Sequence, residues 1–364
     1  MLNLPRALIA LSALALIPSS AMAANWSLVI HGGAGTIERS KLTPEKDAEI
    51  RKGLAAALDA GSKILAEGGS SLDAITAAVA ILEDDPNFNA GRGAVFTWEG
   101  TNSLDASIMR GDTRAAGAVA GVSRTRNPVK LARAVMEHSP HVLLSGPGAD
   151  EFARGQGLEQ VDPSFFYTKE RFDQLQKYKA AAEQGKKMSQ LDIDHKFGTV
   201  GAVALDSHGN IAAATSTGGM TGKRWGRIGD SPIIGAGTYA DNCACGVSAT
   251  GSGEYFIRAG VAQQICTRLR IERDVRAARA GGYDFGVTDI IDPAAAKAVR
   301  IPVAISQQVA DQVMADVKAL GGDGGVIVMT PEGDALYSFN TPGMYRGRAT
   351  SAGQHEVGIY GDEK

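Results

Sequence analysis

Gly198 and Thr199 stand where a charged stretch of the chain gives way to an apolar run, Val200–Leu205. A threonine hydroxyl is a weak nucleophile, because it is almost never ionised at neutral pH. It becomes effective when the threonine is the first residue of a chain, since a free α-amine with a pKa of about 8 can then act as its base. This chemistry requires the Gly198–Thr199 peptide bond to break. The alternative interpretation is a strand that begins after a loop and happens to contain a threonine.

Arg227 and Asp230 lie three positions apart in a loop flanked by glycines. The planar guanidinium of an arginine matches a carboxylate through two parallel hydrogen bonds. An aspartate beside it can face an ammonium group. Together the two side chains could hold the α-carboxylate and the α-ammonium of an amino-acid substrate. The alternative is a surface ion pair, which contributes little to stability.

Two further threonines could assist a nucleophile at residue 199. Thr217 lies in a segment predicted to pair with Val200–Leu205 across a hairpin, where a threonine is also common for structural reasons. Thr250 precedes Gly251, and a hydroxyl and a backbone N–H can both point at a developing negative oxygen. Taken alone, residues 250–253 are equally typical of a loop before a helix.

Six short blocks of sequence occur in an order that resembles a known family. The blocks are residues 31–35, 89–95, 198–206, 215–221, 226–232 and 249–254. They resemble the plant-type L-asparaginase/isoaspartyl peptidase family of N-terminal-nucleophile hydrolases. The resemblance covers nearly the whole chain after its first two dozen residues, and several ordered motifs are far more specific than any one of them.

The resemblance implies a role for each residue that matches the family's motifs. Thr199 is the expected nucleophile, freed by cleavage after Gly198, and Thr217 is expected within hydrogen-bond reach of it. The other residues are expected to form the oxyanion hole (Thr250, Gly251), to bind the substrate (Arg227, Asp230, Gly253) and to position the nucleophile (Asn89). The implied reaction is hydrolysis of the side-chain amide of L-asparagine, and of the isopeptide bond of β-aspartyl dipeptides, through an acyl-enzyme.

The loop at residues 82–92 resembles the family's sodium-binding loop. In this loop backbone carbonyls hold the ion, and the matching positions are Leu82, Glu83, Asp85, Phe88, Ala90 and Arg92. Carbonyl oxygens suit a hard cation. The arginine side chain at position 92 is unusual beside a cation, but it is harmless if only its carbonyl binds. A structural sodium is therefore expected, and no cofactor is expected for the chemistry.

The pattern of apolar residues predicts an α+β fold with two stacked sheets covered by helices. Thr43 and Pro44 predict a helix start, and Gly68 predicts its end. A second helix is expected at about residues 72–82, and further helices at 253–269 and 304–320. Strands are expected at residues 26–31, 200–205, 211–215, 233–240, 246–250, 326–329 and 335–339. The family resemblance implies a four-layer αββα sandwich.

The composition excludes several classes of protein. The chain has 364 residues, of which 44% are hydrophobic, so it can bury a large core. Its formal net charge of −3 favours neither nucleic acid nor an anionic membrane surface as a partner. The family resemblance implies an (αβ)₂ homodimer of cleaved protomers with small-molecule substrates.

Residues 1–23 match a secretory signal peptide. Arg6 supplies the positive charge, an apolar segment follows, and Ala21 and Ala23 form a small-residue cleavage site. The apolar segment is shorter than the ~20 residues that a membrane span needs. The mature protein is expected to be periplasmic or secreted, without a membrane anchor. It would consist of an alpha subunit at residues 24–198, ending in a mobile linker, and a beta subunit at residues 199–364, together forming one structural domain.

Three cysteines and one histidine invite other interpretations. Cys243, Cys245 and Cys266 are an odd number for an exported protein, and their spacing suits neither a redox pair nor a zinc site, so buried thiols are expected. His31 with its two following glycines could be a lipase-like oxyanion motif. We reject this because the matching candidate nucleophile segment, residues 214–218, continues a hairpin instead of turning into a helix.

Three rival functions differ from the one that the motifs favour. Glycosylasparaginase shares the nucleophile chemistry, but it differs in the blocks that contain His31 and Met220. A non-catalytic exported binding protein on the same scaffold is disfavoured by the intact set of threonines and charged residues. Bacterial-type asparaginases also reach the periplasm, but their glycine-threonine signature at the mature N-terminus is absent from this sequence.

Overall fold

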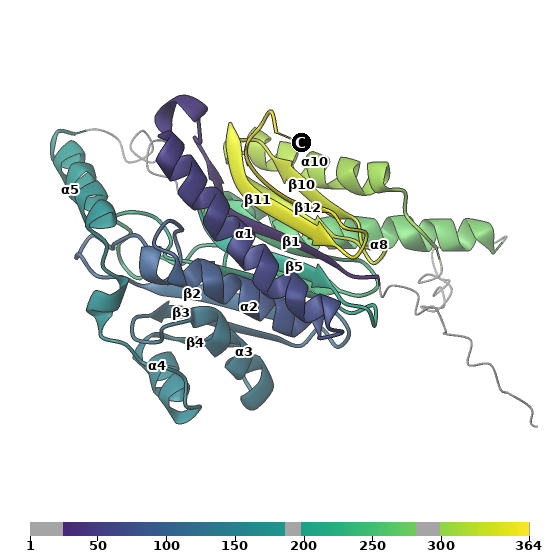
Figure 1. Ribbon diagram of the computed structural model, residues 1–364, viewed down its shortest axis with the longest axis horizontal. Helices are drawn as coiled ribbons and strands as arrows, with labels where there is room; N and C mark the ends of the chain where they lie inside the picture. Colours follow the sequence, from purple (N-terminus) through teal and green to yellow (C-terminus); the bar gives the residue numbers. More distant parts are fainter. Residues whose placement is uncertain (1–24, 186–197, 282–298, 364) are drawn as a thin grey trace, which may run out of the picture.

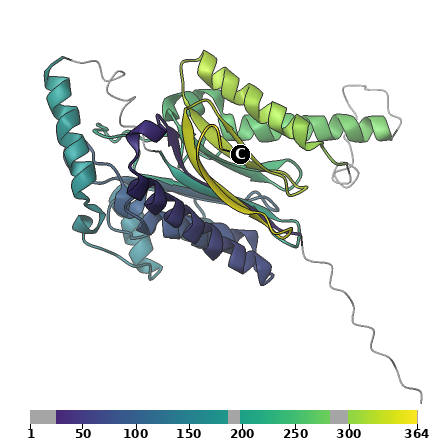
Figure 2. The same cartoon turned by 45° about the horizontal axis from the view of Figure 1, so that its top comes forward.

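The computed structural model describes residues 25–185, 198–281 and 299–363. The predicted signal peptide and residues 186–196 of the predicted linker lie outside this part. Two β-sheets and the helices packed on them form the described structure (Figures 1 and 2). The mixed helix-and-sheet architecture expected from the sequence is therefore confirmed.

The larger sheet has eight strands in the order β12-β11-β1-β5-β6-β2-β3-β4. Only the β3–β4 pair is parallel among its described strands. In chain order the strands are β1 (Ser27–Gly35), β2 (Leu104–Arg110), β3 (Ala116–Val122), β4 (Leu143–Ser145), β5 (Val200–Leu205), β6 (Ile211–Thr217), β11 (Gly343–Thr350) and β12 (His355–Tyr360).

The smaller sheet is antiparallel and has four strands in the order β10-β9-β8-β7. Its strands are β7 (Thr238–Asp241), β8 (Cys245–Gly251), β9 (Gly324–Met329) and β10 (Ala335–Phe339). The helices are α1 (Pro44–Ala66), α2 (Ser71–Asp84), α3 (Pro128–His138), α4 (Gly146–Gly155), α5 (Lys169–Glu183), α7 (Gly253–Ala259), α8 (Val261–Ala280) and α10 (Val303–Ala319).

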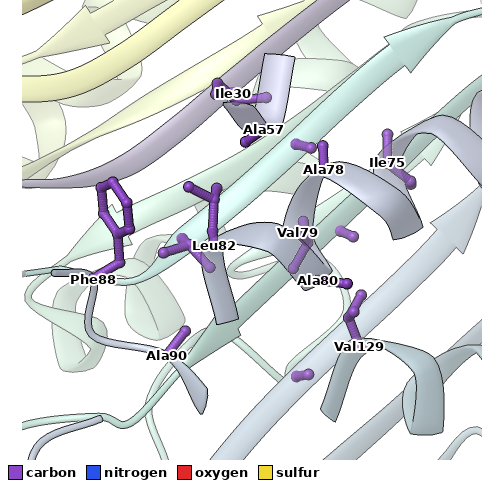
Figure 3. Close-up of a cluster of buried hydrophobic side chains, with 14 of the residues drawn as sticks. Ile30, Ala57, Ile75, Ala78, Val79, Ala80, Leu82, Phe88, Ala90 and Val129 are labelled. Atoms are coloured by element: carbon purple, nitrogen blue, oxygen red, sulfur yellow. The ribbon is translucent and has the colours of Figure 1, made fainter. Parts of the chain in front are cut away.

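Helices α1, α2 and α3 pack against the larger sheet (Figure 1). Figure 3 shows part of the hydrophobic core beneath them, where Ile30 of β1 lies beside Ala57 of α1, and Val79 of α2 belongs to the same cluster. Phe88 and Val129 extend this core, and all five side chains are fully buried. Burying a side chain of the size of valine, isoleucine or phenylalanine contributes about 1.5–3 kcal/mol.

The two sheets pack against each other through a second apolar cluster. Val29 and Val203 of the larger sheet meet Ile327 and Met329 of β9 there, and all four are buried. A third cluster joins β8 and β9 to α8 and α10. Strand β5 of the larger sheet contacts β8 and β9 of the smaller one. The candidate site, at the start of β5, therefore lies at the boundary between the sheets.

A capping signal predicted the first helix, and the apolar pattern of residues 72–82 predicted the second. Thr43 accepts a hydrogen bond from the Lys46 N–H at 3.2 Å, and Pro44 takes the first helical position, so α1 begins as predicted. It ends at Ala66, and Gly68 follows with a φ of +82°. Ser70 caps α2 by accepting from the Asp73 N–H at 3.1 Å.

Three predicted elements differ from the structure. The first strand does not stop at His31 but continues to Gly35 through a bulge between His31 and Gly33. The strand expected at residues 233–240 begins only at Thr238, because the preceding residues form turns in which Gly235 has a φ of +94°. The helix expected at residues 253–269 is two helices, since Gly260 is left-handed.

The prediction of three buried thiols was wrong. Cys245 and Cys266 form a disulfide, with Cα atoms 5.1 Å apart, and Cys243 is a half-buried free cysteine. The pairing arises because α8 packs on β8, which brings together two residues 21 positions apart in the sequence. That Cα separation lies in the range in which a bridge can form.

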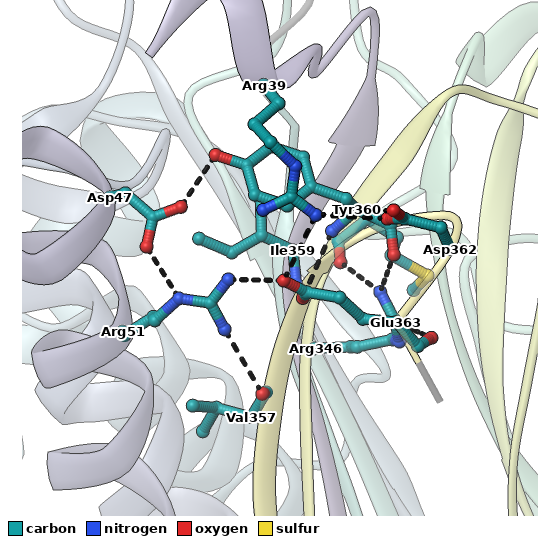
Figure 4. Close-up of polar contacts among 10 residues, drawn as sticks. Arg39, Asp47, Arg51, Arg346, Val357, Ile359, Tyr360, Asp362 and Glu363 are labelled. Carbon is teal, nitrogen blue, oxygen red and sulfur yellow. Dashed lines mark hydrogen bonds and ion pairs between the residues drawn. The ribbon is translucent and has the colours of Figure 1, made fainter. Parts of the chain in front are cut away.

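Polar contacts fasten the end of the chain to α1 (Figure 4). Arg51 of α1 donates to Asp47 and to Glu363, each at 2.6 Å, and the Tyr360 hydroxyl donates to Asp47 at 2.6 Å. These contacts hold β12 at the edge of the larger sheet. In the part of the chain that the structure describes, no helix is both long enough and apolar enough to cross a membrane.

Candidate active site

Thr199 lies directly before β5, buried at the boundary between the two sheets. Its hydroxyl donates a hydrogen bond to the Thr217 hydroxyl at 3.1 Å and lies 3.4 Å from the Ser231 hydroxyl. Thr217 is the last residue of β6. The structure therefore brings Thr199 and Thr217 together, as the sequence predicts.

The β5–β6 hairpin creates this juxtaposition. The Asp206 carboxylate accepts from the backbone N–H groups of His208 and Asn210, each at 3.0 Å, and so closes the connecting turn. The resulting register places Val200 opposite Ser216, so the residues just outside this pair, Thr199 and Thr217, also lie across from each other. A turn set by local hydrogen bonds thus fixes the partner of the candidate nucleophile.

Thr250 lies against the peptide that precedes Thr199. Its hydroxyl is fully buried and has no hydrogen-bond partner among the described residues. A Cβ atom at Gly198 would collide with this hydroxyl and would come within 2.8 Å of the Gly33 Cα, so only glycine fits at position 198. Gly251 has a φ of +152°, and a Cβ there would lie 2.7 Å from the Gly324 Cα. The Thr250 hydroxyl is therefore an available hydrogen-bond donor beside Gly198, the residue after which cleavage is predicted.

Asn89 acts on the other side of the pair of threonines. Its side-chain amide donates to the Gly219 carbonyl at 2.8 Å, and its backbone carbonyl accepts from the Gly218 N–H at 3.0 Å. The Gly219 N–H in turn donates to the Thr217 hydroxyl at 3.0 Å. Within the described residues Asn89 has no hydrogen bond to Thr199, so its link to the expected nucleophile runs through Gly219 and Thr217.

The side chains of Arg227 and Asp230 both lie close to Gly253. A Cβ at Gly253 would come within 2.9 Å of both the Arg227 Nη2 and an Asp230 carboxylate oxygen. The alternative interpretation required an ion pair between the side chains of Arg227 and Asp230, and the described structure does not form one. The guanidinium instead donates to Glu254, from Nε at 2.9 Å and from Nη2 at 3.0 Å.

Asp230 is a buried carboxyl group with an unsatisfied oxygen. Its Oδ2 has no hydrogen-bond partner in the described ranges, and burial raises the pKa of the group to about 7. The charge of Arg227 opposes this rise, whereas the negative charges of Glu254 and Asp105 add to it. A carboxyl group in this position is suited to a cation such as an ammonium group, because a buried charge is stable only when it is paired.

The loop at residues 82–92 offers backbone carbonyls of the kind that the expected cation would need. Leu82 and Glu83 lie in the last turn of α2, where backbone carbonyls lack helical partners and carry the negative end of the helix dipole. The Arg92 guanidinium lies 5.8 Å from the centroid of the Phe165 ring, so the side chain is engaged elsewhere. The described residues contain no group of three or more His, Cys, Asp or Glu side chains that could hold a metal ion. Any cation held by this loop would thus depend on carbonyl oxygens.

Three residues at the site escaped the sequence-based prediction. Ser231 lies beside the Thr199 hydroxyl, Glu254 holds the Arg227 guanidinium, and His31 contacts the Thr199 carbonyl with Nδ1 at 2.9 Å. All three belong to motif blocks that carried the resemblance, so the signal was present. Their types gave no role, because serine, glutamate and histidine occur in many settings.

The family described as Asparaginase matches this chain over residues 24–284, which is well over half of its length. The chain belongs to the asparaginase family. The resemblance inferred from the six motif blocks is thereby confirmed.

Individual relatives in the asparaginase family support the assignment over most of the chain. The isoaspartyl peptidase of Escherichia coli is 44% identical over 338 residues, which cover 92% of this chain and 95% of that protein. The human isoaspartyl peptidase/L-asparaginase is 43% identical over 260 residues, covering 71% and 81%. The plant-type L-asparaginase of Pyrococcus abyssi is 45% identical over 260 residues, covering 69% and 82%.

Proposed function

We propose that this protein is an isoaspartyl peptidase and L-asparaginase that activates itself by cleaving its Gly198–Thr199 bond. One observation carries the proposal. The Thr199 hydroxyl is hydrogen-bonded to Thr217, while the unpartnered Thr250 hydroxyl lies against Gly198. A nucleophile, its neighbour and a free hydrogen-bond donor thus converge on one peptide bond, in a chain 44% identical to an isoaspartyl peptidase.

Self-cleavage would proceed through an ester. The Thr199 hydroxyl oxygen attacks the Gly198 carbonyl carbon, the C–N bond breaks, and the hydroxyl proton passes to the departing nitrogen. Water then hydrolyses the ester between Gly198 and the Thr199 side chain, which leaves a Gly198 carboxylate and a free Thr199 α-amine. The Thr250 hydroxyl, which lies beside Gly198 and has no partner among the described residues, would donate to the negative oxygen that forms during the attack.

Turnover would use the new α-amine as the base. The amine takes the Thr199 hydroxyl proton as the oxygen attacks the side-chain amide carbon of the substrate, and it then delivers the proton to the leaving ammonia or amine. Water hydrolyses the resulting acyl-enzyme to release aspartate. Thr250 and Gly251 would supply the donors of the oxyanion hole. Arg227 would hold the α-carboxylate of the substrate and Asp230 its α-ammonium, with Gly253 leaving room for both groups.

Two observations favour this function over its rivals. The relatives named above are isoaspartyl peptidases and asparaginases, which favours these activities over that of a glycosylasparaginase. The Thr250 hydroxyl and one Asp230 carboxylate oxygen are buried without hydrogen-bond partners among the described residues, and each such group destabilises the fold. A catalytic role explains why both are present, whereas a non-catalytic protein on the same scaffold does not require them.

The proposal includes several wider properties. We propose that the fold is of the four-layer αββα type, which the packing of helices on each of the two stacked sheets supports. A structural sodium would bind the carbonyls of residues 82–92. Cleaved protomers would form an (αβ)₂ dimer, and the near-neutral charge supports no nucleic-acid partner. Export and removal of residues 1–23 agree with the Cys245–Cys266 disulfide, since such bonds persist in oxidising compartments.

Intact-mass measurement of the purified protein tests the proposal. The active protein should consist of two fragments, residues 24–198 and 199–364. Thr199→Ala lacks the hydroxyl, so it should remain one chain and release no ammonia from L-asparagine. Gly198→Ala should also stay uncleaved, because its Cβ collides with Thr250. Thr199→Ser keeps a nucleophile but loses the methyl group that restricts χ1, so it should cleave slowly and turn over poorly. A Thr199→Ala protein that still splits or hydrolyses asparagine refutes the proposal.

A further inference from the structure

His31 is a fully buried histidine that bridges the two sheets, and the proposed mechanism gives it no task. It lies at the bulge of β1 in the larger sheet, where its Nδ1 is 2.9 Å from the Thr199 carbonyl oxygen. Its Nε2 is 2.8 Å from the hydroxyl of Ser248, which belongs to β8 in the smaller sheet. A Cβ at Gly201 would come within 2.5 Å of Nε2, so a glycine at that position leaves room for the ring.

The contacts of His31 determine which ring nitrogen carries its proton. A carbonyl oxygen can only accept a hydrogen bond, so Nδ1 must donate to Thr199. Nε2 is then the acceptor and the Ser248 hydroxyl is the donor. Burial also lowers the pKa of His31 to about 3, so the ring stays neutral near pH 7.

This single tautomer sets the direction of a longer chain of hydroxyl groups. Ser248 has one proton and gives it to His31, so its oxygen accepts from the Thr215 hydroxyl, 2.7 Å away. Thr215 in turn accepts from the Thr238 hydroxyl. The Gly237 carbonyl, 3.1 Å from the Thr215 oxygen, is a longer contact than the one to Ser248. The hydroxyls of Ser248, Thr215 and Thr238 therefore all point toward His31.

The ordered chain ends at Thr238. The neighbouring Ser107 hydroxyl lies 2.8 Å from the Thr238 hydroxyl, but it lies 2.6 Å from the Ser231 carbonyl oxygen, which can only accept its proton. We propose that His31 is a positioning residue for Thr199. Its Nδ1–H holds the Thr199 carbonyl, and the Ser248 hydroxyl, ordered in turn by Thr215 and Thr238, keeps the ring in the tautomer that can donate there.

The consequence for catalysis rests on the proposed function. Cleavage after Gly198 removes the covalent tether on the amino side of Thr199. The His31 contact is made to the carbonyl on the opposite side of the residue, so cleavage leaves it intact. It restrains the new chain end at the moment when the hydroxyl and the amine must be aligned. Misplacing a reacting group by about 1 Å can lower the rate of a step by roughly 100-fold.

Three substitutions separate the two hydrogen bonds of the ring. In His31→Asn the side-chain amide takes the place of the Nδ1 donor, whereas in His31→Gln it reaches toward Ser248 but gives up the donor at Thr199. His31→Leu removes both. We expect kcat for L-asparagine to fall by roughly 100-fold in His31→Leu and His31→Gln, with KM within about twofold. His31→Asn should recover at least tenfold of that loss. The control His355→Asn, at an exposed histidine paired with Asp59, should leave kcat unchanged.

A measurement on the unsubstituted protein tests the tautomer directly. In protein with ¹⁵N-labelled histidine, the resonances absent from His31→Asn identify the His31 ring. Nδ1 should be protonated and Nε2 unprotonated, and neither should change between pH 5 and pH 8. Ser248→Ala should shift the Nε2 resonance and leave that of Nδ1 nearly in place. This readout stays decisive even if His31→Leu or His31→Gln fails to fold.

Two results would overturn the positioning role. One is a His31→Asn enzyme that is folded and cleaved yet loses as much kcat as His31→Leu. The other is a ring that is protonated at Nε2 or titrates near pH 6.5. An unsubstituted protein that hydrolyses neither L-asparagine nor β-aspartyl dipeptides would refute the proposed function instead, and the NMR assignment would still test the hydrogen bond.

Discussion

Arg227 and Glu254 are joined by two parallel hydrogen bonds, from Nε to Oε1 at 2.9 Å and from Nη2 to Oε2 at 3.0 Å. The arginine proposed to bind the substrate is thus already aligned by a protein carboxylate in the free enzyme. A guanidinium has a second edge, formed by Nη1 and Nη2, that can still bind a carboxylate. Glu254 therefore orients the fork and leaves this edge for the substrate.

Blocking either α-group of the substrate should abolish hydrolysis. N-acetyl-L-asparagine has no ammonium group for Asp230, so its rate of ammonia release should fall at least 100-fold below that of L-asparagine. Arg227→Lys should lower kcat/KM for L-asparagine to a similar extent, because lysine lacks the planar fork. Equal rates for the two substrates, or an unchanged kcat/KM in Arg227→Lys, would show that Arg227 and Asp230 do not bind the α-groups of the substrate.

Asp230 should give kcat/KM a pH dependence that kcat lacks. In the free enzyme this carboxyl group is protonated below its pKa of about 7 and cannot pair with an ammonium, so kcat/KM should rise as the pH increases through about 7. In the complex the substrate ammonium keeps the carboxylate ionised, so kcat should show only the titration of the Thr199 amine, whose reference pKa is about 8.

Glu254→Gln provides the matched variant for this pH dependence. The charge of Glu254 raises the pKa of Asp230, so its removal should move the lower limb of the kcat/KM profile to more acidic pH. The limb of the kcat profile should stay in place. Identical limbs in the two profiles of the unsubstituted enzyme, or a kcat/KM limb that does not move in Glu254→Gln, would assign the titration to another group.

Gly253→Ala should weaken substrate binding without unfolding the protein. The added methyl group would lie 2.9 Å from both the Arg227 Nη2 and the Asp230 carboxylate, so these groups must move apart. We expect KM for L-asparagine to rise about tenfold or more, measured by ammonia release. Gly155→Ala at the end of α4 is the control, because a Cβ there meets nothing within 4 Å. Equal KM values for the two variants would contradict the role of Gly253.

Removing the Cys245–Cys266 disulfide should destabilise the smaller sheet. A bridge between residues 21 positions apart contributes about 2–4 kcal/mol, so the Cys245→Ala/Cys266→Ala double variant should melt roughly 5 °C or more below the unsubstituted protein. Differential scanning calorimetry measures this shift. Cys243→Ala should melt normally, since Cys243 is the free cysteine. A double variant with an unchanged Tm would show that the bridge is energetically neutral.

Local signals in the sequence were enough to predict the elements that carry the site. A cap such as Thr43 acts on an N–H three residues away, and the Asp206 turn closes through neighbours two and four positions away. Such interactions depend on residues that are adjacent in sequence, so their patterns can be recognised there. The pairing of Thr199 with Thr217 followed from the hairpin for the same reason.

Other features arise only when the two sheets meet. His31 and Ser248 are 217 positions apart, and Ser107 and Thr238 are 131 apart, so no local pattern connects them. The disulfide likewise depends on the packing of α8 against β8, and an odd count of cysteines argued against it. The motif blocks contained several of these residues, but a motif gives residue types without giving their partners.

The strand order of the larger sheet has a consequence for the cleaved protein. β1 comes from the segment before Gly198, yet it lies between β11 and β5 from the segment after it, and β2 likewise borders β6. Two chains interleaved in this way cannot separate by sliding apart, because release of one requires unzipping a central strand on both sides. Once denatured, they can regain the sheet only by meeting again in solution. Refolding of the mature protein should therefore be a second-order process that slows on dilution, whereas the uncleaved precursor folds at a rate independent of its concentration.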